Sequence, residues 1–155
     1  MTTSPKPVDA TADAWHVLRN RTFDEIAIGD SASLERAFSS QDIHMFALQS
    51  GDVDPEPAVS SSARGTTEAI CANALISAVL GTRLPGPGTQ YVSQNLRLLG
   101  AVRPGDRLTV QMQVSSKDTA THHVTLDCTC TSQEGVAIFQ GQVEVVAPTE
   151  RLERT

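Results

Sequence analysis

The chain has 155 residues, within the usual range of about 100–200 residues for one domain. Hydrophobic residues make up 39% of it and charged residues 19%, so it can form a core and is not a charge-rich disordered chain. The formal net charge of −6 argues against nucleic acids and anionic membranes as partners, because binding to phosphates depends on clustered basic residues.

The composition also predicts a cytoplasmic location. No run reaches the roughly 20 apolar residues that a bilayer span needs, and the first residues lack the apolar segment of a secretion signal. The three cysteines, Cys71, Cys128 and Cys130, are an odd number, which does not favour a disulfide framework. We therefore expect reduced thiols in a reducing compartment.

The chain divides into one domain and two tails. Residues 1–20 contain Thr, Ser, Pro and Asp without hydrophobic periodicity, which predicts a flexible N-terminal tail. The domain is expected over residues 21–148, and residues 149–155 are expected to form a short charged tail. No internal repeat divides the domain.

The first predicted elements are a strand and two helices. A weak alternating pattern predicts a strand over residues 31–38. Ser39 or Ser40 can cap a short helix that ends near Gly51. A second helix is expected over residues 66–81, and because it is apolar on nearly every side we expect it to be buried.

Longer strands follow the second helix. Apolar side chains alternate there with Thr, Gln and Asp, which is typical of half-buried strands. The strands are expected over residues 91–99, 108–114, 124–131 and 136–146. The short connections between them indicate antiparallel pairing. The pattern predicts an α+β fold in which an antiparallel sheet wraps around a central buried helix.

Four stretches of the sequence resemble one enzyme family. They are residues 21–30 (RTFDEIAIGD), 40–55 (SQDIHMFALQSGDVDP), 74–106 and 128–148. These stretches are similar to the MaoC-like, (R)-specific enoyl-CoA hydratases, and most similar to the hydratase half of bifunctional enoyl-CoA hydratase/phosphate acetyltransferases. The resemblance implies a hot-dog fold and a homodimer in which two sheets join edge to edge. It also implies an acyl thioester of coenzyme A or of a carrier protein as substrate, with no further cofactor.

The catalytic pair of this family lies in a G-D-x-N-P-x-H motif, and this chain matches it in part. Gly51 and Asp52 match the first two positions, so the resemblance implies that Asp52 is the catalytic Asp. Asp54 stands at the Asn position, and Pro57 stands at the position of the catalytic His. In the family, Asp and His hold one water and add it across the double bond of a trans-2-enoyl thioester. Since Pro57 has no titratable group, we expect weak or lost activity.

The family polarises the thioester oxygen with a backbone N–H at the start of the central helix, within an H-G-M step. That step reads Glu68-Ala69-Ile70 in this chain, so the resemblance places substrate-binding backbone at Ala69 and Ile70. A helix N-terminus favours the enolate that forms there. We further expect Gln94 to line the acyl tunnel beside Val92 or Leu96.

Two other functions remain open alternatives. The chain can be a non-catalytic hot-dog subunit that binds an acyl thioester and pairs with an active relative. It can also be a hot-dog thioesterase, in which Glu68 at the start of the buried helix activates water against the thioester. An ordinary structural role for Glu68 also fits, since a carboxylate is favoured at a helix N-terminus.

No metal site is predicted. His122 and His123 are adjacent at the start of a strand, where neighbouring side chains point to opposite faces. The three cysteines lack a fourth ligand and the usual spacing. His44 is expected to be an exposed helical residue. Four arginines could contact the nucleotide of the thioester: Arg83, Arg97, Arg103 and Arg107.

Overall fold

The long helix α2 lies at the centre of the fold. The structure is a computed structural model that describes residues 18–51 and 66–154. The elements, in chain order, are β1 (Leu18–Arg19), the short 3-10 helix η1 (Phe23–Glu25), β2 (Ser31–Ala37), α1 (Ser40–Ser50), α2 (Thr66–Thr82), β3 (Gln90–Leu98), β4 (Arg107–Asp118), β5 (His123–Ser132), β6 (Ala137–Val146) and β7 (Glu153–Arg154).

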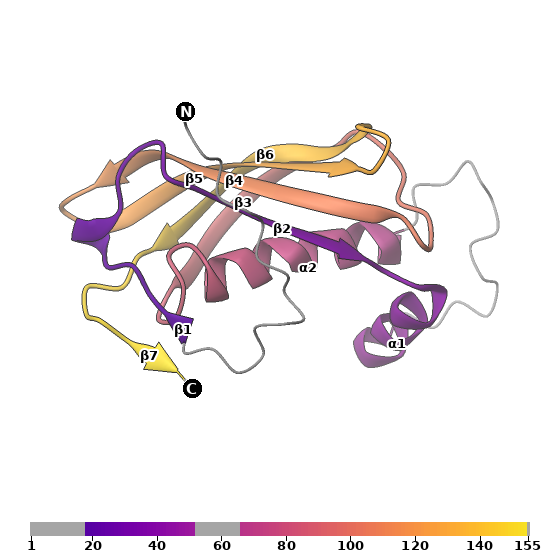
Figure 1. Cartoon of the computed structure of the whole chain (residues 1–155), viewed down its shortest axis with the longest axis horizontal. Coiled ribbons are helices and arrows are strands. Elements are labelled where there is room, and N and C mark those ends of the chain that lie inside the picture. Colours follow the sequence, from indigo (N-terminus) through magenta and orange to yellow (C-terminus); the bar gives the residue numbers. More distant parts are fainter. Residues whose placement is uncertain (1–17, 52–65, 155) are drawn as a thin grey trace, which may run out of the picture.

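Five strands form one antiparallel sheet with the order β2-β4-β5-β6-β3. Helix α2 runs along one face of this sheet, as Figure 1 shows. Helix α1 contacts α2 and lies near its N-terminal end (Figure 1). The predicted α+β hot-dog fold, an antiparallel sheet around a central helix, is therefore confirmed.

The core lies between α2 and the face of the sheet turned toward it, which we call the inner face. Alternate residues of the central strands are buried there, since successive side chains of a strand point to opposite faces. The buried inner-face residues of β4 and β5 are Leu108, Val110, Met112, Val114, Val124, Leu126, Cys128 and Cys130. From α2, the buried residues against them are Ala72, Leu75, Ile76, Val79 and Leu80.

The prediction that this helix is buried is confirmed for one side only. Ala74 and Ser77 of α2 are exposed, and Asn73 is half-buried. The reason is geometric, because the sheet covers the side of α2 that carries Leu75, Ile76 and Val79 and leaves another side uncovered. Among the described residues, no helix is long and apolar enough to cross a membrane.

The two ends of the described chain are joined, which corrects part of the predicted tails. Strand β1 pairs with β7 in antiparallel register, with Leu18 opposite Arg154. Residues 18–20 of the predicted N-terminal tail and residues 153–154 of the predicted C-terminal tail are thus structured. We call residues 18–20 and 150–154 the terminal clasp. Residues 1–17 lie outside the described part.

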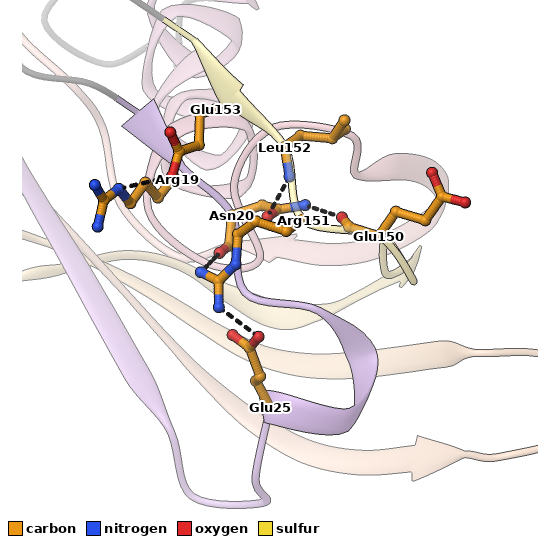
Figure 2. Close-up of polar contacts among 7 residues, drawn as sticks. All are labelled: Arg19, Asn20, Glu25, Glu150, Arg151, Leu152 and Glu153. Atoms are coloured by element: carbon orange, nitrogen blue, oxygen red, sulfur yellow. Dashed lines mark hydrogen bonds and ion pairs between the residues drawn. The ribbon is translucent and has the colours of Figure 1, made fainter.

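Asn20 holds the terminal clasp together and is only 1% exposed. Its side chain donates to the Glu150 carbonyl at 2.7 Å and accepts from the Leu152 N–H at 2.9 Å (Figure 2). Arg151 donates to the Asn20 carbonyl at 3.0 Å and to Glu25 at 2.5 Å. Short β-strands need such side-chain bonds, because a pair of two-residue strands has little surface to bury.

The terminal clasp also contacts the turn that follows α2. Directly after the clasp residue Asn20, the Arg21 N–H donates to the Pro85 carbonyl at 2.7 Å, which connects the N-terminal segment to this turn. Gly88 has φ +90°, and a Cβ there would lie 2.7 Å from Leu152. The positive φ favours glycine at this position, and the short distance shows how closely Leu152 lies against the turn. The clasp therefore stabilises the end of α2 distant from α1.

We predict that Asn20→Ala lowers the free energy of unfolding by about 1–3 kcal/mol, because it leaves the Glu150 carbonyl and Leu152 N–H without their buried partner. Urea unfolding followed by circular dichroism measures the change. Arg19→Ala is the control, since the Arg19–Glu153 ion pair is exposed and such pairs contribute about 0–1 kcal/mol. Equal, small effects of both substitutions would contradict the role assigned to Asn20.

Candidate functional site

Helix α1 begins and ends at well-defined caps, which positions the segment that follows it. Ser39 accepts a hydrogen bond from the Asp42 N–H at 3.1 Å, and Asp42 accepts one from the Ser39 N–H at 2.9 Å. This reciprocal pair is a capping box. The helix ends at Gly51 with φ 77°, a left-handed conformation that glycine adopts readily. The predicted Ser39 cap and Gly51 end are both confirmed.

The carboxylate of Asp42 is fully exposed, yet its environment lowers its pKa. The backbone N–H of Ser39 is the largest cause, followed by the Ser39 side chain. Because the folded pKa lies below the ordinary value of 3.8, the cap stabilises α1 above that pH and is lost as the pH falls through the folded pKa.

A pocket of about 490 Å³ opens between α2, β3 and the end of α1. Its lining residues are Phe46, Asn73, Ala74, Ile76, Ser77, Tyr91 and Gln94. Three apolar side chains and the polar groups of four others thus converge on one cavity. A mostly apolar cavity with a few convergent polar groups is typical of a small-molecule site.

Strand β3 forms one wall of the pocket. Tyr91 donates its hydroxyl hydrogen to Oε1 of Gln94. Burial, with a smaller effect of Cys128, raises the pKa of Tyr91 above its ordinary value of 10.0. The phenol is therefore protonated at neutral pH and acts as a hydrogen-bond donor.

The pocket wall depends on a close approach of β3 to β6. A Cβ at Gly141 of β6 would lie 1.9 Å from the Asn95 carbonyl of β3. No other residue fits at this position without moving one of the strands. Gly141 thus allows β3 to lie where Tyr91 and Gln94 line the pocket.

The structure describes only some of the predicted site residues. Asp52 and Pro57 lie outside the described residues. The backbone of Glu68, Ala69 and Ile70 lies in the first turns of α2, as expected, but their side chains are not among those described. Gln94 lies on β3 and lines the pocket.

Sequence reasoning did not assign the other six lining residues to a site: Phe46, Asn73, Ala74, Ile76, Ser77 and Tyr91. Two of them carried a signal. Asn73 and Ser77 are four residues apart on a helix that is otherwise apolar over residues 69–80, and this spacing places them on one face. Polar residues at that spacing on a core helix indicate a face that contacts something other than the core.

None of the described histidines lines the pocket. His44 is exposed on α1. His123 pairs with Glu144 at 2.5 Å, on the sheet face opposite α2, and the ring of His122 packs edge-on against Phe23 at 5.1 Å between centroids. Within the described residues, the imidazole that the family uses therefore has no counterpart at the pocket.

The described cysteines are not nucleophiles at neutral pH. Cys128 and Cys130 are free and buried on the inner face. Burial raises the pKa of each thiol to about 12, so both remain protonated and unreactive. Among the described residues, no group of three or more His, Cys, Asp or Glu side chains is placed to hold a metal ion.

Two of the four arginines considered for nucleotide binding have protein partners. Arg83 donates to the Ser33 carbonyl at 2.6 Å, and Arg107 pairs with Glu35 at 2.9 Å. Both arginines therefore contribute to packing around β2. Nothing in the structure tests the role expected for Arg97 or Arg103.

Known proteins resemble the chain over most of its length. It is 37% identical over 132 residues to an (R)-specific enoyl-CoA hydratase of Rhodospirillum rubrum, covering 81% of this chain and 91% of that protein. It is 36% identical over 137 residues to a 3-hydroxybutyryl-CoA dehydratase of Methylorubrum extorquens, covering 84% and 87%. No family model matches the chain.

Solved structures agree with these relatives. The R-hydratase PhaJ1 of Pseudomonas aeruginosa superposes with a TM-score of 0.81 at 30% identity, covering 90% of this chain and 94% of that one. The likeness to that hydratase therefore extends over nearly the whole fold.

Proposed function

Because the chain belongs to the (R)-specific enoyl-CoA hydratase family, we propose that it is a hydro-lyase of slow turnover. Its reaction interconverts a trans-2-enoyl thioester and a 3-hydroxyacyl thioester of coenzyme A, which is substrate and not cofactor. The relationship to the Rhodospirillum rubrum hydratase carries this proposal. The pocket between α2 and β3 supports it, since its mostly apolar lining beside the middle of α2 can hold an acyl chain.

In the proposed mechanism, Asp52 is the general base. It takes a proton from water as the water oxygen adds to C3 of the enoyl group, and it returns that proton to C2. Backbone N–H groups at Ala69 and Ile70, in the first turns of α2, donate to the thioester oxygen, where negative charge develops. The N-terminal end of the helix dipole favours the same charge.

The proposed mechanism uses no imidazole. The motif resemblance aligns Pro57 with the catalytic His of the family, so in this proposal Asp52 orients the water without an imidazole. Loss of a general acid or base lowers rates by roughly 10²–10⁴-fold. The proposal is therefore a hydratase with a conserved scaffold and a reduced rate.

We predict slow hydration of crotonyl-CoA by the wild type, followed by the loss of its enoyl absorbance. Pro57→His is expected to raise the rate by about tenfold or more, since it restores a positioned acid/base group. Asp52→Asn is expected to abolish the activity that remains.

Pro57→Ala is the matched control, because it removes the proline without adding an imidazole. An equal gain from Pro57→Ala and Pro57→His would contradict the role given to the missing ring. Release of free thiol from acyl-CoA, abolished by Glu68→Gln, would favour the thioesterase instead. Binding of acyl-CoA without either reaction would favour a non-catalytic subunit that pairs with an active relative.

We propose that β3 is the dimer edge. It ends the sheet order in the described part of the chain and pairs there with β6 alone. Its exposed apolar side chains include Val92, which is 45% exposed, and Leu99 next to it is 39% exposed. An apolar sheet edge of this kind is suited to pairing with another strand. A second copy is the proposed occupant, with an active hydratase as the alternative.

We propose the cytoplasm as the location of this activity. The free thiols of Cys128 and Cys130 fit a reducing compartment.

We predict that Val92→Lys converts the homodimer to a monomer, because charge on an edge strand opposes pairing between strands. Sedimentation velocity measures the change in mass. Thr129→Lys is the control, since Thr129 is exposed on the central strand β5, away from both sheet edges. A monomeric wild type, or dissociation of both variants, would contradict the assignment of β3.

A further inference from the structure

The inner face of the sheet is apolar except at the pocket. Buried Val143 and Val145 of β6 continue the apolar surface of β4 and β5. On β3, the inward residues opposite them are Gln94 and Tyr91, which pair with Val143 and Val145 respectively. A polar side chain on a core face is unfavourable unless it is hydrogen-bonded. These two side chains therefore face the pocket instead of the packed core.

A β-bulge places both side chains on this face. Residues three positions apart on a regular strand point to opposite faces, since the period is two. The pairing passes from Tyr91–Val145 directly to Ser93–Glu144, so Val92 is an extra residue without a partner on β6. Bulges are often found next to active sites, where they redirect a side chain. Here the bulge brings Tyr91 and Gln94 together.

The contact between the two residues orients the Gln94 amide. Tyr91 donates to Oε1 of Gln94, which leaves the amide NH₂ as the donor group that Gln94 offers. Asn73 and Ser77 of α2 line the same pocket from the other side. The described lining residues carry no formal charge. The pocket thus combines neutral hydrogen-bonding groups with the apolar surfaces of Phe46, Ala74 and Ile76.

We propose that Gln94, oriented by Tyr91, selects acyl groups that carry a neutral oxygen acceptor beyond the thioester. The preferred acyl group has a carbonyl or hydroxyl oxygen in its chain, which accepts a hydrogen bond from the Gln94 amide. Gln94 is exposed to solvent in the free protein, and a plain alkyl chain that displaces this solvent offers the amide no hydrogen bond in its place. This inference rests on the proposed function, since it takes the ligand to be an acyl thioester.

The test compares two acyl-CoA ligands of equal size, 4-oxopentanoyl-CoA and 4-methylpentanoyl-CoA. Neither has a 2,3-double bond, so calorimetry measures binding without turnover. We expect the wild type to bind the oxo ligand roughly twofold to tenfold more tightly, the range for one hydrogen bond. Gln94→Leu is expected to abolish or reverse this preference, while its affinity for the methyl ligand stays the same or rises.

Gln140→Leu is the matched control, because Gln140 is exposed on β6 and does not line the pocket. It is expected to keep the wild-type preference. Gln94→Met serves as a second variant of similar length, in case the branched leucine prevents folding. Tyr91→Phe is expected to reduce the preference, since it removes the hydroxyl that orients the amide.

The outcomes separate this inference from the function on which it rests. Equal binding of both ligands by the wild type overturns the inference and leaves an acyl-thioester site in place. An equal loss of affinity for both ligands in Gln94→Leu also overturns the inference, because it indicates a structural role for the residue. If neither ligand binds the wild type, the acyl-thioester function fails, and the inference fails with it.

Discussion

The packing of α2 against the inner face of the sheet is the constraint on which the other features depend. Leu75, Ile76 and Val79 on one side of the helix meet alternate Val, Leu, Met and Cys residues of the central strands. This contact removes the largest apolar surfaces from water, which is the dominant favourable contribution to folding. It also fixes the position of the helix N-terminus relative to β3, since a packed interior tolerates little displacement.

The pocket arises because one helix cannot cover five twisted strands. Helix α2 has its close backbone contacts with β2 and β4, whereas β3 lies at the opposite edge of the sheet. The side of α2 that carries Asn73 and Ser77 is therefore available to line a cavity with Tyr91 and Gln94. The same edge presents exposed Val92 and Leu99. Ligand site and proposed dimer edge are thus adjacent for one geometric reason.

Sequence periodicity predicted the elements whose side chains alternate between core and solvent. The strand through Val110 and Met112 and the helix capped by Ser39 follow directly from such local patterns. The terminal clasp was not predictable in this way, because strands of two residues have no periodicity and Asn20 bonds to residues 130 and 132 positions away. The Tyr91–Gln94 pair was missed because their spacing implies opposite faces, and a bulge is not visible in the pattern. Asp52 was assigned by resemblance, and the described residues leave that prediction untested.

Binding and chemistry depend on different kinds of structure in this chain. The pocket residues Asn73 and Gln94 lie on α2 and β3, which the core holds in place. The segment that resembles the acid/base motif of the family follows the Gly51 cap in sequence, and its Pro57 position belongs to no predicted helix or strand. Residues that connect elements can change without disturbing a core, whereas residues on packed elements are constrained by their neighbours. A substitution at the motif position that Pro57 occupies in the sequence would therefore leave the hot-dog fold and the polar pocket in place.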